Sequence, residues 1–178
     1  MDERDFDCLI EHYPRIRRAA LMLSNVDAWE ADDLAQETML QAARGWHAFN
    51  GASQVHTWLY SILLNQHRRR LRSKGRWWRS WMAWFDQKPG RHDAAPDKQI
   101  VAEEWRQSLW SAVAELPEAQ KQAILLRYSE DFSYEQIAQV LQCPLGTVKS
   151  RLHHGLRALA KKLQNGDAAA AFAELTNR

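Results

Sequence analysis

A tight turn before Pro144 separates two short helical patterns, and this arrangement limits the fold more than any other feature of the chain. Ser133, with Gln136 three residues later, fits a capping box that opens the first helix. Pro144 must end that helix and suits the start of the next one, so the turn holds little more than Gln142 and Cys143. Two short helices joined by so brief a turn predict a helix-turn-helix.

The helix after this turn has one apolar stripe and one basic face. The stripe follows a spacing of three and four residues and comprises Val148, Leu152, Leu156, Leu159 and Leu163. The opposite face and its flanks carry only hydroxyl and basic side chains, namely Thr147, Lys149, Ser150, Arg151, His153, His154, Arg157 and Lys161. Such side chains approach base edges and neutralise phosphates. The face therefore predicts DNA binding, and a merely solvated basic face is the alternative.

A metal site at the adjacent His153 and His154 is not expected. Neighbouring residues on a helix point about 100° apart, and no third ligand stands at helical spacing. Cys8 and Cys143 are too few and too far apart for a disulfide framework or a zinc site, so each is expected to be a free thiol.

Charge is distributed unevenly along the chain, although its net value is only +2. From Asp2 to Glu37 there are ten acidic and four basic residues. From Thr38 to Phe85 there are eight basic residues and no acidic one, and residues 136–166 add five basic residues, again without an acid. Two basic zones behind one acidic zone indicate two contacts with a polyanion and one contact with something else.

The fold class predicted from these patterns is all-α. Apolar residues recur at spacings of three and four through most of residues 6–72, without sustained β-type alternation, and helical spacing resumes from about residue 100. Between these parts, residues 86–99 carry two prolines, a glycine and mixed charges, which is typical of a linker. We therefore expect two small helical domains at 1–75 and 105–164, a linker at 76–104 and a tail at 165–178.

A helix expected over residues 28–46 has an apolar side and an acidic side. The acidic side presents Asp32, Asp33, Gln36, Glu37 and Leu40, followed by Arg44. Negative charge repels DNA, whereas carboxylates beside an exposed leucine suit a protein surface that has basic and apolar patches. This side predicts a protein-binding face, and an ordinary solvated acidic face is the alternative.

The next segment combines aromatic and basic side chains. A glycine-containing loop leads into a helix with Trp58, Tyr60 and Asn65, and five basic residues follow between Arg68 and Lys74. Aromatic rings beside a basic track can stack on unpaired bases, and asparagine can hydrogen-bond a base edge. Both aromatic residues can instead belong to the core, which we favour for Trp58. The basic run is the stronger signal, because so dense a cluster is typical of polyanion binding.

Three stretches resemble the characteristic segments of the extracytoplasmic-function (ECF) sigma factors, the two-domain group of the sigma-70 family. They read ADDLAQETMLQAARGW, FNGASQVHTWLYSILLN and ELPEAQKQAILLRYSEDFSYEQIAQVLQCPLGTVKSRL. The resemblance spans about residues 5–74 and 105–163, in the family's order. It implies that the two domains are sigma region 2 and sigma region 4, and that the chain confers promoter recognition on RNA polymerase without enzymatic activity.

The resemblance also implies a partner for each group of residues. The clamp helices of the polymerase β′ subunit would be bound by Asp32, Asp33, Gln36, Glu37 and Leu40. The −10 element, with bases flipped from the stack, would be contacted by Asn50, Ser53, Gln54, His56, Thr57, Asn65, Arg68, Arg69 and Arg72. The −35 element would be contacted by Thr147, Lys149, Ser150, Arg151, His153, His154 and Arg157. Earlier helices of the second domain would contact the β flap, and an anti-sigma factor is an expected regulator, with no cofactor, metal or small-molecule substrate.

The chain also departs from the family in several places. His154 and Leu156 stand where the family often has arginine, and Arg69 stands where it commonly has aspartate. The promoter sequence therefore cannot be transferred from relatives.

The most informative departure is RWWRSWMAWF, residues 76–85. Its aromatic residues follow helical spacing and are Trp77, Trp78, Trp81, Trp84 and Phe85. They would form a large exposed apolar patch unless covered. The first hypothesis is that the segment extends the last helix of the first domain and packs on it. The second is a contact with a regulator or within a closed, inactive form, and the third is a membrane-surface helix.

Other functions fit less well. A dimeric helix-turn-helix regulator is the alternative, but it would need two half-sites and no acidic helix. An enzyme is not expected, because neither HExxH, a Gly-rich phosphate loop nor a nucleophile and base pairing is evident. The acidic start is unlike a secretion signal, and no apolar run approaches the roughly 20 residues that span a bilayer. We expect a cytoplasmic, nucleoid-associated protein that is held at the membrane, if at all, through an anti-sigma factor.

Overall fold

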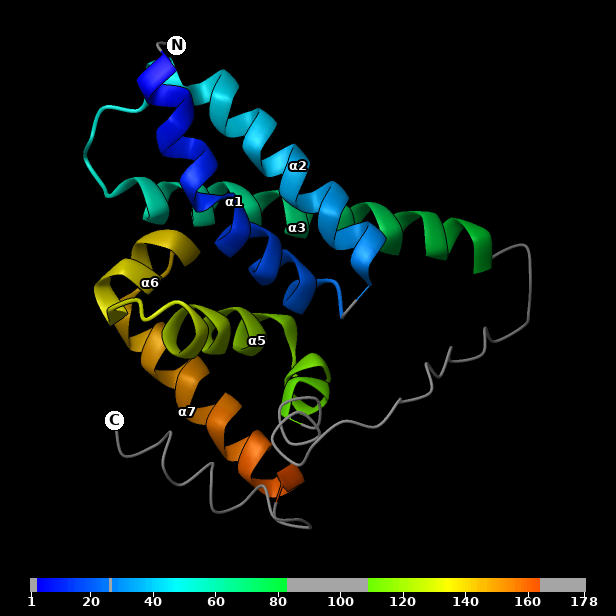
Figure 1. The fold of residues 1–178 in the computed structure, drawn as a ribbon. Helices are drawn as coiled ribbons and strands as arrows, with labels where there is room; N and C mark the ends of the chain where they lie inside the picture. Colours follow the sequence, from blue (N-terminus) through cyan, green and yellow to red (C-terminus); the bar gives the residue numbers. More distant parts are fainter. Residues whose placement is uncertain (1–2, 26, 83–108, 164–178) are drawn as a thin grey trace, which may run out of the picture.

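The computed structural model describes residues 3–25, 27–82 and 109–163, and every regular element in this part of the chain is helical (Figure 1). The first domain contains α1 (Glu3–Leu23), α2 (Ala28–Gly45), the 3₁₀ turn η1 (Trp46–Ala48) and α3 (Val55–Met82). The second contains a helical segment at 109–114, α5 (Glu118–Ile124), the π-helical turn η2 (Leu125–Ser129), α6 (Tyr134–Leu141) and α7 (Leu145–Leu163). The all-α prediction is confirmed.

The first domain is built on close packing of α1, α2 and α3. The carboxylate of Asp27 accepts a hydrogen bond from the Glu30 backbone N–H at 3.1 Å and caps the start of α2. The side of α2 predicted to be apolar is buried, with Ala31, Leu34, Ala35, Thr38 and Ala42 in the core. Small side chains let α1 and α2 approach closely, and α3 completes the core with Leu59, Leu63 and Leu64.

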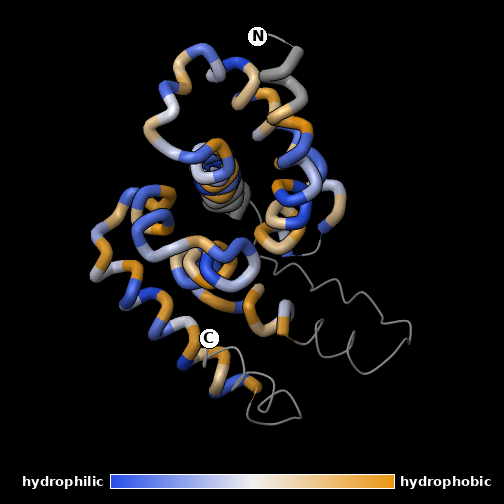
Figure 2. Tube along the Cα trace, turned by 60° about the vertical axis from the view of Figure 1, so that its left-hand side comes forward, coloured by the Kyte–Doolittle hydropathy of each residue, from blue (hydrophilic) through white to orange (hydrophobic). Residues whose placement is uncertain are grey.

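The second domain has the predicted capping box and turn. The Ser133 hydroxyl accepts from the Gln136 backbone N–H at 3.2 Å, and the Gln136 side-chain oxygen accepts from the Ser133 N–H at 2.8 Å. Gln142 ends α6 in the left-handed conformation, with φ 51°. After Pro144, α7 buries its predicted stripe, of which Leu156 alone is half-buried. Along this and other helices, hydrophobic and hydrophilic residues alternate (Figure 2).

The two domains lie against each other. In Figure 1, α5 and α6 lie beside α3, and the buried apolar residues of both domains form a single cluster. Phe132, which is 1% exposed, packs edge-on against Tyr60 of α3 with ring centroids 5.1 Å apart. The domains therefore share a continuous core in this arrangement.

The helix α3 continues to Met82, across the domain boundary expected at residue 75. Trp77, Trp78 and Trp81 lie on this helical extension, so the extension in the first hypothesis is confirmed, whereas the packing that it also predicts stays a prediction. Trp84 and Phe85 lie outside the described residues. The domain boundaries remain predictions. Within the described ranges, no helix is long and apolar enough to cross a membrane.

Candidate functional site

The predicted −35 residues all lie along α7, on the side away from its buried stripe. We call them the α7 basic face: Thr147, Lys149, Ser150, Arg151, His153, His154 and Arg157. All are exposed except Thr147 and Arg151, which are half-buried. Because α7 contains no Asp or Glu, this face presents hydrogen-bond donors and positive charge without an acidic neighbour on its own helix.

The first turn of α7 is suited to an anion. The Pro144 carbonyl accepts hydrogen bonds from the backbone N–H groups of Thr147 at 2.9 Å and Val148 at 3.2 Å, so the helix begins sharply after the turn. Thr147 and Lys149 lie in this first part of the helix, where the dipole favours negative charge. Arg151 donates to the sulfur of Cys143 at 3.7 Å, which ties the helix to the turn before it.

The predicted −10 residues form a second surface, which spans the loop before α3 and one side of that helix. We call it the −10 surface: Asn50, Ser53, Gln54, His56, Thr57, Asn65, Arg68, Arg69 and Arg72. The Asn50 side-chain oxygen accepts from the Ala52 N–H at 3.0 Å, and Gly51 has φ 70°, which favours glycine. The loop thus turns sharply at a position where its polar side chains remain accessible.

Three aromatic rings that flank this loop in sequence pack against one another. Trp46 stacks on Phe49 at 5.4 Å between centroids, and Trp58 contacts both rings, at 5.9 Å and 5.0 Å. Trp58 packs against the core, as favoured from the sequence, and Tyr60, two residues further along α3, is fully buried. The Tyr60 ring is therefore not available to stack on a base in this arrangement, whereas Trp58 is half-buried.

Part of the −10 surface faces the second domain instead of solvent. Thr57 is only 2% exposed. The His56 ring lies 5.0 Å from Phe132, and Arg68 donates to the side-chain oxygen of Gln122 at 3.0 Å. By contrast, the remaining polar and basic residues on α3 that were predicted to contact DNA, Asn65, Arg69 and Arg72, are exposed.

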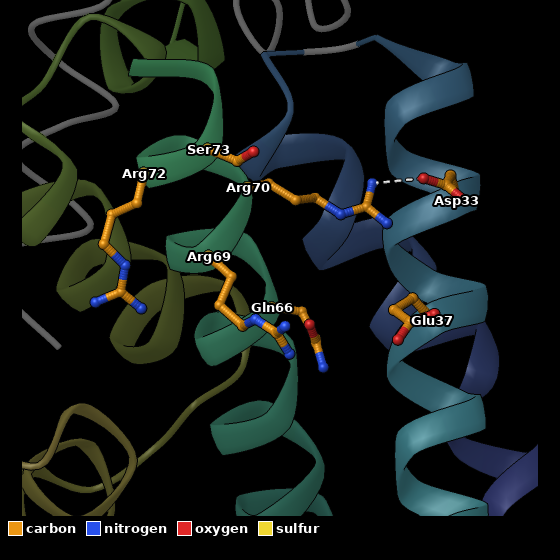
Figure 3. Close-up of a pocket in the computed structure, with 7 residues that line it drawn as sticks. All are labelled: Asp33, Glu37, Gln66, Arg69, Arg70, Arg72 and Ser73. Carbon is orange, nitrogen blue, oxygen red and sulfur yellow. Dashed lines mark ion pairs between the residues drawn. The ribbon is translucent and has the colours of Figure 1, made fainter. Parts of the chain in front are cut away.

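The arginines of the basic run on α3 point in different directions. Arg70 points toward α2 and pairs with Asp33 at 2.8 Å, whereas Arg72 points away from α2 (Figure 3). Arg69 lines the same cleft as Asp33 and Glu37. Opposite charges therefore meet where α2 and α3 run side by side.

The predicted protein-binding residues lie on the outer side of α2, with their carboxylates oriented by neighbours. Asp32 pairs with Arg17 at 2.6 Å, and this hydrogen bond raises the pKa of Arg17. Glu37 accepts from the Gln41 amide at 2.8 Å. Such exposed pairs add little stability, and Asp33, Gln36 and Leu40 remain open to solvent.

Sequence reasoning missed Trp29, which is 89% exposed at the start of α2. It stands one turn before Asp33, so Trp29, Asp33, Gln36 and Leu40 follow helical spacing along one side of the helix. We call these four residues, with Asp32 and Glu37, the α2 face. The spacing was visible in the sequence, but the exposure of the indole was not.

Sequence reasoning also missed a polar network between the domains. His67 pairs with Glu118 at 2.8 Å, and Lys121 donates to the Asn25 side-chain oxygen at 2.9 Å. Burial alone would raise the pKa of Glu118, but the hydrogen bond and charge of His67, with Gln122 and Lys121, lower it overall. The partners are 51 and 96 residues apart in sequence, so no local pattern indicates them.

The described residues hold no group of three His, Cys, Asp or Glu side chains that could bind a metal ion. The His153 and His154 rings lie 5.6 Å apart in an edge-on arrangement. Cys8 and Cys143 are free thiols, as expected. The geometry of the described residues favours binding surfaces.

Two family models match the chain, and each covers one domain. Sigma-70 region 2 matches residues 9–79, and Sigma-70, region 4 matches residues 106–159. The RNA polymerase sigma-H factor of Pseudomonas aeruginosa is 34% identical over 170 residues, covering 92% of this chain and 88% of the relative. The ECF RNA polymerase sigma-E factor of Escherichia coli is 31% identical over 181 residues, again covering 92% of this chain and 88% of the relative.

Solved structures agree with these matches. The sigma factor RpoE of Bartonella quintana, in complex with the anti-sigma factor NepR, has a TM-score of 0.72 at 28% identity, covering 89% of this chain and 95% of that chain. CnrH, in complex with the cytosolic domain of CnrY, has a TM-score of 0.67 at 18% identity, covering 93% and 92%, and supports the fold alone. The chain therefore belongs to the sigma-70 family as an ECF sigma factor, a transcription initiation factor and not an enzyme.

Proposed function

We propose that this sigma factor binds core RNA polymerase through the α2 face and promoter DNA through the −10 surface and the α7 basic face. The observation that carries the proposal is the separation of three chemically different surfaces on one chain. The α2 face combines carboxylates with the exposed Trp29 and Leu40, whereas α7 has no acidic residue. A protein contact and two DNA contacts can therefore form together.

The α2 face suits the clamp helices of the β′ subunit, provided that these present basic and apolar side chains. Trp29 and Leu40 would supply apolar anchors at its two ends, and Asp33 and Gln36 between them would supply polar contacts. In the second domain, α5 and α6 are the proposed contact with the β flap. This division leaves α7 free to read DNA.

The two DNA surfaces suit different forms of the promoter. An exposed helix with basic and hydroxyl side chains fits the major groove of the duplex −35 element. The −10 surface, with its polar loop and the basic side chains of α3, fits a single strand whose bases are unstacked. The proposed domains, region 2 at 1–75 and region 4 at 105–164, each contain one of these surfaces.

An anti-sigma factor is the second proposed protein partner. The Bartonella quintana relative, which was solved with such a factor, matches across both domains of this chain. Trp77, Trp78, Trp81 and Trp84 remain our predicted contact for this regulator. We place the protein in the cytoplasm, where the polymerase acts, and membrane association would then depend on the anti-sigma factor.

Co-elution with purified core RNA polymerase in size-exclusion chromatography tests the proposal. We expect the wild-type chain to co-elute and Asp33→Arg/Glu37→Arg to elute alone, because two reversed charges oppose a basic partner. Glu11→Arg/Glu115→Arg is the matched control, with the same charge change at two exposed residues outside the α2 face, α5 and α6. A wild-type chain that stays off the polymerase but binds duplex DNA as a dimer would contradict the proposal and support the regulator alternative.

A further inference from the structure

We propose that His153 and His154 couple DNA binding by α7 to proton uptake, so that the contact with duplex DNA strengthens as the pH falls below neutrality. This inference rests on the proposed function, in which the α7 basic face contacts the −35 element. It adds a charge that depends on pH. The threonine, serine, lysine and arginine side chains of that face do not change charge between about pH 5 and 8.

The two histidines are placed where a DNA phosphate can reach them. Both are exposed and adjacent in the middle of α7, on the side away from its buried stripe. Their rings lie edge-on with 5.6 Å between the centroids. Within the described part of the chain, neither ring forms a hydrogen bond or an ion pair, so the ring nitrogens are available to a partner.

The charged neighbours of these rings on their own helix are all basic. Lys149 and Arg151 lie one turn before the histidines, and Arg157 lies one turn after them. Because α7 carries no Asp or Glu, no carboxylate on this helix can stabilise a protonated imidazole.

The two helices that pack on α7, α5 and α6, direct their charges elsewhere. On α5, Glu118 and Lys121 pair with each other at 3.7 Å. On α6, Glu135 interacts with Lys149, and Tyr134 is uncharged in this pH range. The negative charge that favours protonated histidines on this face must therefore come from a partner, and DNA supplies it in its phosphates.

This arrangement links protons to DNA. A histidine that is neutral in the free protein and protonated beside a phosphate takes up a proton when the complex forms. By reciprocity, a lower pH then tightens DNA binding to the same extent that DNA tightens proton binding. Arginine at the same positions would carry its charge at every pH and would show no such linkage.

The pH dependence of duplex binding by the full chain tests the inference. Phosphate contacts do not depend on sequence, so a fluorescent duplex of mixed sequence is the probe, and anisotropy measures its affinity. We expect several-fold tighter binding at pH 5.5 than at pH 8.0. The slope of log affinity against log salt should also steepen by about 0.9 for each histidine that contacts a phosphate. His47→Gln, at an exposed histidine outside α7, is the matched control and should behave like the wild-type chain.

Two double variants separate the charge of the rings from a structural role. His153→Gln/His154→Gln should lose the gain at pH 5.5 and bind weakly at both pH values. His153→Arg/His154→Arg should also lose the pH dependence, but it should bind tightly at both. If the rings only supported the structure of the helix, both variants would bind more weakly than the wild-type chain.

Calorimetry counts the protons directly. Titrations at pH 6.5 in two buffers with different ionisation enthalpies give the number of protons taken up when the chain binds the duplex. We expect uptake by the wild-type chain and less uptake by His153→Arg/His154→Arg. All other histidines are common to both proteins, so they do not contribute to the difference.

The outcomes separate this inference from the proposed function. If the wild-type chain and the arginine variant have the same pH dependence, or take up equal numbers of protons, the linkage at His153 and His154 is wrong even though DNA binding persists. If the wild-type chain binds the duplex at neither pH, the α7 basic face is not a DNA contact, and the proposed function itself fails.

Discussion

Trp29 is the most exposed large hydrophobic residue among those that the structure describes. Trp29→Ala should weaken binding to core polymerase by about tenfold, because a buried tryptophan anchor contributes at least 1 kcal/mol to a typical interface. The thermal stability of this variant should equal that of the wild-type protein, since the indole makes few contacts in the free protein. Surface-immobilised polymerase would measure the affinity, with Ile10→Ala, another exposed apolar residue, as the control. Equal affinities for both variants would show that Trp29 does not contribute to polymerase binding.

A comparison of substitutions at Lys149 and Lys162 distinguishes a specific DNA contact from the general effect of positive charge on α7. Lys149 belongs to the α7 basic face, whereas Lys162 pairs with Glu115 near the end of the helix. Lys149→Ala should weaken binding to duplex promoter DNA and reduce the slope of log affinity against log salt by about 1, because one phosphate contact is lost. Lys162→Ala should change neither quantity. Titrations at several salt concentrations measure both, and an unchanged slope for Lys149→Ala would place it outside the phosphate contact.

At this scale the sequence predicted the DNA-binding face better than the buried contacts. Helical periodicity alone placed Val148 inside and Lys149 outside, and the structure agrees. Thr57 was expected on the −10 surface, yet it is buried in this arrangement. It stands at helical spacing from the buried Tyr60 and Leu64, so it belongs to the buried side of α3.

At the scale of elements, the second domain depends on close contact between α5 and α7 at Gly155. A β-carbon at this position would lie 3.2 Å from Ile124 and 3.4 Å from Gln120. Gly155→Leu should therefore destabilise the protein by about 1–3 kcal/mol through overpacking. Gly146→Leu on the same helix is the matched control, because a β-carbon at this position would meet nothing within 4 Å. Urea unfolding measures both, and equal stabilities would show that the α5 and α7 contact tolerates a side chain.

Helix starts and turns were predictable because their signals are local. The capping box at Ser133 and the turn at Gln142 follow from a few adjacent residues. The extension of α3 to Met82 was predicted only as one of three hypotheses, because tryptophan-rich helical spacing also suits a regulator or a membrane surface. The π-helical turn at Leu125–Ser129 was not predicted, since an irregular turn of this kind depends on tertiary packing.

At the scale of the whole molecule, the contact between the two domains, which we call docking, should depend on pH. Burial first, then Arg15 and His12, lower the pKa of His56 below its ordinary 6.5, against an opposing effect of Glu130. Glu118, facing His67, Lys121 and Gln122, also has a pKa lowered from its ordinary 4.5. Both groups bind more protons when the domains are apart, so docking is favoured above pH 6.5 and weakens as the pH falls, first through His56 and then through Glu118.

Solution scattering at pH 7.5 and 5.5 measures this dependence, and we expect a larger radius of gyration at the lower pH. His56→Gln should reduce the change, because glutamine does not titrate. A radius that is the same at both pH values would show that His56 is not coupled to docking.

The relative placement of the domains was beyond sequence reasoning. The chain's resemblance to ECF sigma factors supplied the domains and their order, but the pairs that join them, such as Arg15 with Glu130, lie up to 115 residues apart. The interface therefore became visible only in three dimensions.

Binding of fluorescently labelled protein to core RNA polymerase tests the central claim most directly. A dye would be attached at Ser111→Cys, an exposed position outside the α2 face, α5 and α6, in a chain with Cys8→Ser and Cys143→Ser. We predict that the fluorescence anisotropy rises when core polymerase is added, and that it stays unchanged for Asp33→Arg/Glu37→Arg. An anisotropy that does not rise for the wild-type chain, or that rises equally for the double variant, would contradict binding through the α2 face.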